Sequence, residues 1–548
     1  MKKGFLIAVF LGFISLSVKA QLYQVGLRLI DFEKYEAARD IFGVLVKNNP
    51  SNGDYYYYLG QTYINLLNID SAEFNYNAGI KIAPANPANY AGLGEIELML
   101  GNKAKATEYF NKALSFSMAK NGTYTDIRAI TLVATGMVSN DNIKMLDEAE
   151  VLIRMGYDQN KRDYNLLIAG GDVYLERNDG GNAATFYERA IAVDPKNPKA
   201  YVRVAVIWLR VKNFESAQSD LNRAFEKDSL YAPALKYQAE LYYAQHKFEK
   251  AKETYLKYLQ HSEPSTANQI RFARILFLSK EYDEALTKIE ELQKKDTLTL
   301  ILYRLRGYST YEVIALKNDI EKARLGLAAL EYYMKKVDPK KIIAADYEYL
   351  GMLQAKVSGK DSLALINLYK ALEMNPANVE IYKEIAKTYN KMKRFEEAAA
   401  TYEFYLTKAK RTNAGDYFLM GKMHYYAKNF YKADTAFMKV NELIPEYAEA
   451  YLWRGNANSN IDPTYKTEIA KENFEKFISV LKADSVKFIA LKDKNKANLI
   501  AAYRYIGIFY LNKDNEAKAK EYFKEILELD PDNEEAKKVV YPPKQPEK

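Results

Sequence analysis

Residues 500–533 read IAAYRYIGIFYLNKDNEAKAKEYFKEILELDPDN and contain two runs of helical periodicity separated by a polar segment. The first run places Gly507 and Tyr510 on one face, and the second places Phe523 on one face. A small residue allows the two helices to approach closely, and the large rings fill the space beside it. Pro531 ends the second run because proline lacks a backbone N–H and clashes with the preceding helical turn. The stretch therefore predicts two amphipathic helices joined by a tight turn.

The same arrangement recurs along the chain at a fixed spacing. Small residues mark the period in two unbroken series, Gly26, Gly60 and Gly94, and then Gly171, Ala205, Ala239, Ala273 and Gly307. The period is 34 residues, and we number the repeat so that Tyr503 is position 4 and Gly507 is position 8. This period, with an aromatic residue at position 4 and Gly, Tyr, Ala, Phe and Pro at later fixed positions, resembles the tetratricopeptide repeat family. One hairpin cannot bury its apolar face alone, so the resemblance implies an all-α protein, a right-handed α-solenoid of stacked helix hairpins.

The repeat frame predicts about 14 hairpins over residues 21–540. The fourth hairpin is irregular, and we expect a bend near residues 120–160 that separates an N-terminal segment, 21–155, from the main solenoid, 156–540. Residues 482–496 read as a long charged connection before the last hairpin. The proline-rich tail, 541–548, is predicted to be disordered.

Residues 1–20 are typical of a secretory signal peptide. Lys2 and Lys3 precede an apolar run, and the small residue Ala20 marks the expected cleavage site. An uncleaved anchor is the alternative, although the apolar run is short for a membrane span. We expect no transmembrane span after cleavage, with peripheral membrane association left open. The pattern predicts export to the periplasm or the outer membrane of a bacterium with two membranes.

Composition excludes several classes of chemistry. The chain has no cysteine, which rules out disulfides, thiolate metal sites and cysteine nucleophiles, and suits an oxidising compartment. The formal charge of +8 falls to +5 when the three lysines of segment 1–20 are removed, which does not favour nucleic acid binding. The three histidines, His246, His261 and His424, fall in no metal or catalytic motif. We therefore expect no enzyme activity, no catalytic residues, no bound metal and no cofactor.

Family resemblance implies where a partner would bind. In such proteins the first helix of each hairpin lines a concave groove, and positions 2, 5, 9, 12 and 13 of the repeat face inward. Mapped onto this sequence, these positions give a basic set that could hold an anionic peptide end: Lys383, Lys387, Asn390, Lys391 and Lys422. A charge run is more often a solvated helix face, so that alternative stays open.

The same positions give an aromatic set: Phe277, Tyr308, Tyr311, Phe418, Tyr425 and Tyr426. Exposed rings could hold a peptide, whereas buried rings would pack against neighbouring hairpins. Tyr23 and Tyr57 could extend such a stripe at the N-terminal end.

These observations predict an exported scaffold that binds protein or peptide partners in the cell envelope through its groove. One alternative is capture of a glycan or cell-wall strand by the tyrosine-lined groove, with Asn456, Ser459 and Asn460 as the polar group nearest to this requirement. The other is an enzyme with its site in the insertions near Asn140 or Asp462, although these segments are too short to build a pocket unaided.

Overall fold

The computed structural model describes residues 19–119, 124–139, 143–263, 265–295, 298–315, 319–483 and 485–542, with only the backbone described for 485–492. The described residues are helical and form no strand; a single bridge joins Met118 and Tyr124. The contacts divide the chain into two compact units, one ending at Thr297 and the other beginning at Leu298. Most of the predicted signal peptide and of the predicted tail lies outside the described residues, so both stay predictions.

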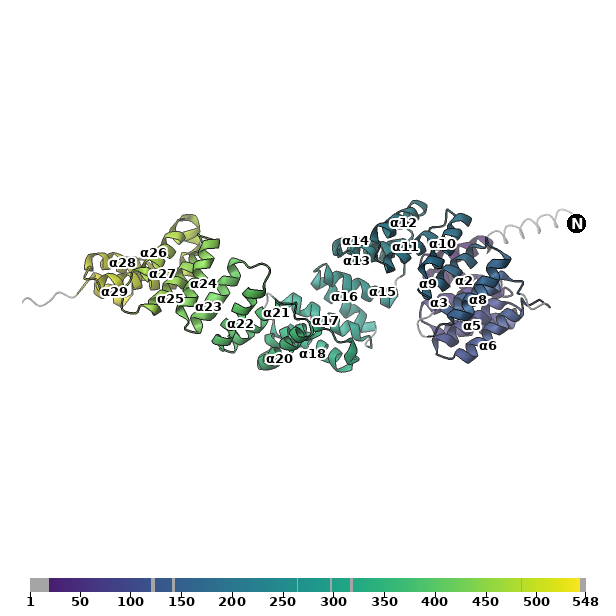
Figure 1. Ribbon diagram of the computed structural model, residues 1–548, viewed down its shortest axis with the longest axis horizontal. Helices are drawn as coiled ribbons and strands as arrows, with labels where there is room; N and C mark the ends of the chain where they lie inside the picture. The colour runs from purple at the N-terminus through teal and green to yellow at the C-terminus, as the bar shows by residue number, and fades with distance from the viewer. Residues whose placement is uncertain are drawn as a thin grey trace, which may run out of the picture. The chain divides into compact units, whose positions relative to one another are not determined.

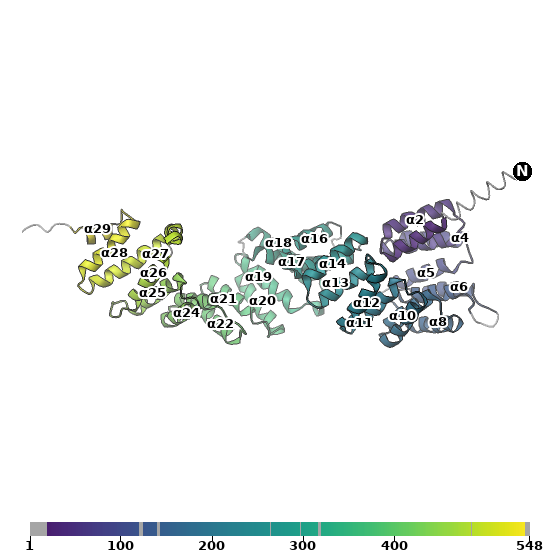
Figure 2. The same cartoon turned by 90° about the horizontal axis from the view of Figure 1, so that it is seen from above.

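The first unit contains eight helix hairpins in chain order (Figures 1 and 2). Their helices are residues 19–31 with α2 (Tyr35–Asn48), then α3 (Gly53–Asn65) with α4 (Ile69–Ile82), α5 (Pro87–Met99) with α6 (Lys103–Ser115), α7 (Ile127–Val138) with α8 (Leu146–Gln159), α9 (Tyr164–Glu176) with α10 (Gly180–Val193), α11 (Pro198–Arg210) with α12 (Phe214–Lys227), α13 (Ala232–Ala244) with α14 (Phe248–His261), and α15 (Thr266–Leu278) with α16 (Tyr282–Lys295).

The second unit contains six hairpins, a short 3₁₀ turn η1 (Pro339–Lys341) and a closing helix. Its helices are α17 (Leu300–Ile314) with α18 (Ile320–Lys336), α19 (Ala344–Lys356) with α20 (Asp361–Met374), α21 (Ile381–Lys391) with α22 (Phe395–Lys408), α23 (Ala414–Tyr426) with α24 (Phe430–Leu443), α25 (Ala448–Ile461) with α26 (Ile469–Lys482), α27 (Ser485–Leu511) with α28 (Glu516–Leu529), and finally α29 (Glu534–Val540). The predicted all-α solenoid of fourteen hairpins is confirmed.

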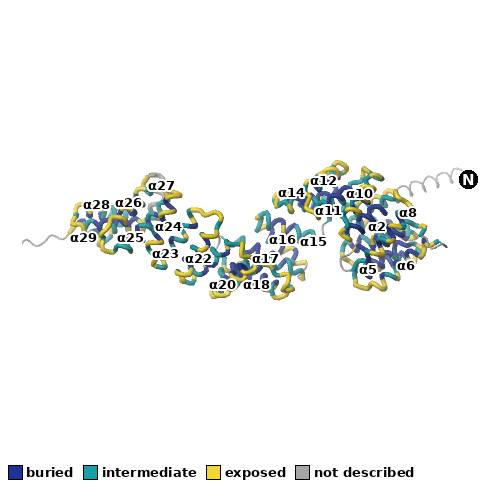
Figure 3. The backbone as a smooth tube through the Cα atoms, in the orientation of Figure 1, coloured by how far each residue is buried: buried dark blue, intermediate teal, exposed yellow. Residues whose placement is uncertain are grey.

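Small residues at the repeat's eighth position face a ring from the second helix of the same hairpin. A Cβ added to Gly60 would lie 2.3 Å from Tyr76, and one added to Gly94 would lie 2.5 Å from Phe110. The rings of Tyr76 and Phe110 are fully buried. Figure 3 shows buried segments running through the helices while the turns are exposed. Each hairpin thus buries its apolar face against itself and its neighbours.

The turn inside a hairpin has a recurring backbone geometry. Ten described residues other than glycine have a positive φ. Nine of them occupy the same place in the turn after the first helix of a hairpin, and Gly101 occupies that place in the third hairpin. The nine are Glu33, Leu67, Asn178, Lys212, His246, Lys280, Lys393, Lys428 and Asp514. Eight of these nine side chains are exposed, and Glu33 alone among them is partly covered. Another part of the chain therefore covers the turn of the first hairpin and leaves the other turns exposed.

Three features differ from the sequence expectation. The boundary expected between residues 155 and 156 lies inside the first unit, because α7 packs on α9 and one apolar cluster runs from Ala91 to Ile207. The connection expected at 482–496 is helical from Ser485 onward, since the segment holds no proline and is rich in good helix formers. The helix α29 was not foreseen; Asn533 caps it, and its buried Ala536 covers the end of the last apolar cluster.

Candidate partner-binding surfaces

The turn of the first hairpin, residues 28–37 (the N-terminal turn), lies against a surface formed by much later hairpins of the same unit. We define the receiving surface as Lys199, Tyr231, Lys236, Tyr258 and Glu263, from the beginnings of α11 and α13, from α14 and from the residues after it. Lys199 and Lys236 occupy positions 2 and 5 of their repeats, which the family frame assigns to the inner face. The inner face of this unit therefore holds a polypeptide segment.

Acidic groups of the N-terminal turn meet basic and hydroxyl groups. Lys199 Nζ lies 3.2 Å from an oxygen of Asp31, and the same carboxylate lies close enough to the Tyr231 hydroxyl to raise its pKa. Glu33 pairs with Lys236 Nζ, and the Tyr258 hydroxyl donates to Glu33 Oε2 over 2.5 Å. The Glu33 and Lys236 side chains are only 14% and 21% exposed, so this pair is screened less by solvent than a surface pair.

Burial raises the pKa of the Tyr231 and Tyr258 hydroxyls well above their ordinary value, and the nearby acids Asp31 and Glu33 raise it further. Both hydroxyls stay protonated at neutral pH and can act as donors. Asn268 Nδ2 donates to the Tyr258 oxygen over 2.7 Å, which fixes the orientation of that ring. The two tyrosines are therefore pre-positioned to receive carboxylates.

Phe32 supplies the apolar part of this contact. Its ring meets the fully buried Tyr231 edge to face, with centroids 5.3 Å apart. It also packs against two apolar clusters, one of hairpins 6 and 7 that contains Leu221 and one of hairpins 7 and 8 that contains Leu235. An edge-to-face aromatic pair adds about 0.5–1.5 kcal/mol beyond the buried area.

Glu263 caps α2 from the other side of this contact. The residue before α2 is Lys34, whose side chain offers no capping hydrogen bond. The Glu263 carboxylate instead accepts from the backbone N–H groups of Glu36 and Ala37, and its own N–H donates to the Glu33 carbonyl over 2.9 Å. A carboxylate at a helix N-terminus satisfies unpaired N–H groups and the helix dipole. A residue from a distant part of the sequence thus replaces the missing local cap.

In the second unit, three of the four lysines in the predicted basic set pair with acids. Lys383 Nζ lies 3.0 Å from Asp416, and Lys387 and Lys391 each lie 2.7 Å from a carboxylate oxygen, of Glu384 and Asp361 respectively. The side-chain oxygen of Asn390 is buried without a hydrogen-bond partner. An anion would have to compete with these carboxylates, so the anion site stays a prediction that the geometry does not strengthen.

The aromatic set separates into local groups. Tyr308 stacks on Tyr349 at 4.0 Å and donates to Asp346 over 2.8 Å, while Tyr311 meets Tyr349 edge to face. Phe277, in the first unit, is half-buried and packs against Tyr282. These rings pack within one hairpin or between neighbouring hairpins. So do the two tyrosines expected to extend the stripe, since Tyr23 packs between Phe42, Tyr55 and Tyr58, and Tyr57 stacks on Tyr76.

The remaining members gather on α23 and α25 in what we call the aromatic patch: Phe418, Lys422, Tyr425, Tyr426 and Trp453. Tyr425 lies 5.0 Å from Trp453, and the Lys422 ammonium lies 5.1 Å from the same ring. Among the described residues Lys422 forms no ion pair, and Tyr426 is 43% exposed. The patch thus combines Lys422 of the predicted basic set with three rings of the predicted aromatic set. Trp453 was not predicted, because it occupies position 6 of its repeat, which the family frame does not assign to the inner face.

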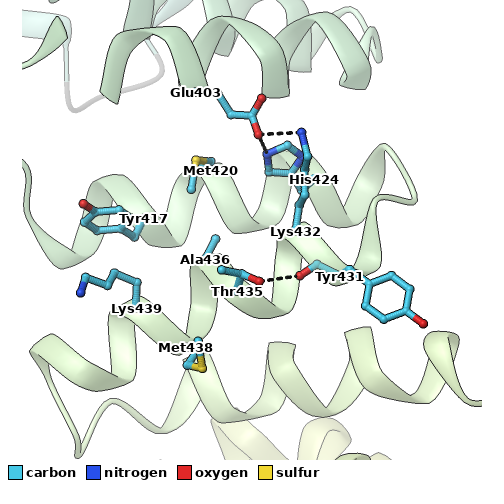
Figure 4. Close-up of a pocket in the computed structure, with 10 residues that line it drawn as sticks. All are labelled: Glu403, Tyr417, Met420, His424, Tyr431, Lys432, Thr435, Ala436, Met438 and Lys439. Carbon is cyan, nitrogen blue, oxygen red and sulfur yellow. Dashed lines mark hydrogen bonds and ion pairs between the residues drawn. The ribbon is translucent and has the colours of Figure 1, made fainter. Parts of the chain in front are cut away.

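A cavity of about 400 Å³ lies between α22, α23 and α24 (Figure 4). It is lined mainly by apolar atoms, with Met420 and Ala436 among its walls, and His424 reaches it from α23. The His424 ring is only 2% exposed. Its Nε2 lies 3.1 Å from Glu403 Oε1 but out of line, so that neither ring nitrogen has a hydrogen-bond partner among the described residues.

His424 predicts a pH-dependent stability. Burial lowers its pKa below the ordinary 6.5, and the opposing effect of Glu403 is smaller. The unfolded chain therefore binds this proton first as pH falls, so the stabilisation is complete above 6.5 and is lost toward the folded-state pKa. His424→Phe should remove this component, of up to about 1.4 kcal/mol per pH unit. Urea unfolding of both proteins from about pH 7.5 to about 5.5 measures the effect, and parallel pH profiles would contradict it.

No group of three or more potential metal ligands occurs in the described ranges. No helix in that part of the chain is long and apolar enough to span a membrane. Near Asp462 the insertion is a local turn, in which the carboxylate accepts from Thr464 and Thr467. Ser459 and Asn460 donate to the Asn456 carbonyl inside α25 and do not converge on a ligand. The segment around Asn140 lies outside the described residues.

Comparison with known proteins identifies the repeats. Family models described as "Tetratricopeptide repeat" match residues 53–86, 168–229 and 506–533. The crystallised C-terminal part of a TPR repeat-containing protein from Cytophaga hutchinsonii is 31% identical, and the match covers 50% of this chain and 99% of that one, with a TM-score of 0.42. A tetratricopeptide repeat protein from Parabacteroides merdae is 18% identical over 48% of this chain and 98% of its own, with a TM-score of 0.32.

A BBSome complex member BBS4 homolog from Drosophila melanogaster is 24% identical over 33% of this chain. That match spans 37% of the fly protein, so it concerns only part of it.

Proposed function

We propose that this chain, which belongs to the tetratricopeptide repeat family, is a scaffold that binds protein partners along the inner faces of its two units. The observation that carries the proposal is the N-terminal turn seated on the receiving surface. That surface holds a polypeptide by two ion pairs, an aromatic contact and a helix cap, which are the interactions used between proteins. A repeat array offers many such positions along one face without any catalytic group.

The proposal includes export to a bacterial cell envelope. Its support is the pattern of residues 1–20, with two lysines before an apolar run and a small residue at the end. A chain without cysteine suits an oxidising compartment. Detection of the mature N-terminus at Gln21 in a periplasmic or outer-membrane fraction would support this location.

The aromatic patch provides the test of protein binding. Lys422→Glu combined with Tyr426→Ala changes one charge outside any ion pair of the described residues and one exposed ring, and exposed Tyr and Trp side chains often dominate binding energies. We expect the pair of substitutions to weaken binding of a purified envelope protein partner by about tenfold or more. The control is Tyr431→Ala on α24, a ring that is 75% exposed and outside the patch.

Affinity capture from envelope extract with the full chain, followed by titration of the recovered protein, makes this measurement. Recovery of a stoichiometric protein that the patch variant loses and the control retains supports the scaffold. Retention only on a carbohydrate resin would contradict it and favour glycan capture.

A further inference from the structure

Each residue of the sequence Asp31-Phe32-Glu33 meets its own complement on the receiving surface. We infer that this surface recognises partner segments that present an acid, an aromatic ring and an acid at the start of a helix, and that the N-terminal turn is an intramolecular occupant of the same site. The inference rests on the proposed protein-binding function and adds to it the chemistry of the partner and its competitor.

The charges of the surface set the sign of the partner. Lys199 and Lys236 face the two acids, and the Tyr258 hydroxyl donates to the Glu33 carboxylate. A basic segment would place its cations against Lys199 and Lys236 and would leave the Tyr258 hydroxyl without its carboxylate acceptor. Such repulsion selects against basic partners at these two positions.

The helix start is a separate requirement. Glu263 accepts from two backbone N–H groups that are free only in the first turn of a helix. These groups belong to Glu36 and Ala37, which follow closely after Phe32 and Glu33. An extended acidic peptide lacks this arrangement of donors, so the surface distinguishes a helix start from a strand with the same side chains.

The N-terminal turn can leave without unfolding its own hairpin. The first hairpin has a separate apolar cluster, in which Phe42 and Leu45 pack with Tyr55 and Leu59 of the second hairpin. The other ion pairs of the turn are open to solvent, since Arg28 is 72% exposed beside Asp228 and Lys199 is 38% exposed beside Asp31. Exposed pairs contribute little to stability. The contact is therefore suited to displacement.

The test uses a fluorescent peptide of residues 21–50, with a side-chain staple on the exposed face of α2 that holds the helix start in isolation, and a control peptide with the same staple and Asp31→Asn, Phe32→Ala and Glu33→Gln. Both are titrated by polarisation into the full wild-type chain and into a full chain carrying the same three substitutions, which removes the internal competitor. A tethered segment competes at an effective concentration on the order of millimolar. We therefore expect the wild-type peptide to bind the substituted chain at least about tenfold more tightly than the wild-type chain.

Two further variants make the test specific. Adding Lys236→Glu to the substituted chain should weaken its binding of the wild-type peptide by about tenfold. A peptide with Glu33→Lys should bind this chain with the lost affinity restored, because the charges are again opposite. Equal binding of wild-type and control peptides, or no binding to a substituted chain whose melting curve is intact, would overturn the inference. If the substituted chain does not fold, the Glu33→Lys peptide is titrated into a chain that carries Lys236→Glu alone. Failure of this peptide to bind that chain would equally overturn the inference.

A second copy of the chain is the remaining possible occupant. Sedimentation of the wild-type chain should give a monomer, whereas a dimer that Lys236→Glu dissociates would mean that hairpins exchange between copies and would overturn the internal occupancy. The two proposals can fail separately. If the peptide does not bind but the aromatic patch still binds its protein partner, this inference is wrong and the proposed function stands.

Discussion

Truncation of Phe110 to alanine is expected to lower the free energy of unfolding by about 3–5 kcal/mol. The ring is fully buried beside Gly94 and belongs to the apolar cluster of hairpins 3 to 6. Its removal leaves a cavity that the rigid helix pair cannot close. Because the Phe110 ring lies beside Gly94 of hairpin 3 and Gly136 of hairpin 4, we expect the loss to be concentrated in these two hairpins.

Hydrogen exchange read by mass spectrometry, combined with urea unfolding, measures both the size and the place of this loss. The control is Phe116→Ala, a ring at the end of α6 that is 38% exposed. Phe437 is the equivalent ring in the second unit and should behave like Phe110. A uniform loss of protection along the chain would contradict a repeat array and would indicate a single shared core.

The second large effect is expected at the buried ion pair of Arg304 and Asp346. The guanidinium donates from Nε and Nη2 over 2.8 and 2.7 Å, and the Asp346 side chain is fully buried. Asp346 also accepts from the Tyr308 hydroxyl and from the Ile343 N–H at the start of α19. Arg304→Met leaves this carboxylate without its cation, which should cost about 3–5 kcal/mol.

The double variant Arg304→Met with Asp346→Asn removes the unpaired charge and should recover about 1–3 kcal/mol of the loss. The exposed pair of Arg324 and Glu321 on α18 is the control, since Arg324→Met should cost no more than about 1 kcal/mol. Equal losses at the two arginines, measured by urea unfolding of the full chain, would show that burial does not decide the effect.

Local patterns predicted the hairpins because the determinants of each hairpin lie within one period. Gly60 and Tyr76 belong to the same hairpin, and their contact follows from the family frame. The predicted charged connection at 482–496 is helical from Ser485, because lysine and alanine are good helix formers even where no apolar periodicity marks the helix. The helix α29 was missed because it is short and follows a proline.

The binding surfaces were harder to predict because they depend on contacts between distant repeats. The repeat frame identified Phe418, Lys422, Tyr425 and Tyr426, and the structure brings them together around Trp453. It gave no sign that Lys391 would pair with Asp361, which belongs to another hairpin, whereas Lys387 pairs with Glu384 three residues earlier in the same helix. Contact between Glu33 and Lys236 spans 203 residues, and no local pattern encodes it.

The central claim, that the inner face of the first unit holds a polypeptide segment, is tested most directly at the N-terminus of α2. Hydrogen exchange of residues 34–38 is compared in the wild-type chain, in Glu263→Ala and in the control Glu253→Ala, a change at an exposed residue of α14. We predict that the Glu36 and Ala37 amides are protected in the wild type and the control and exchange faster in Glu263→Ala, because their acceptor is gone. Identical exchange in all three proteins would contradict the claim.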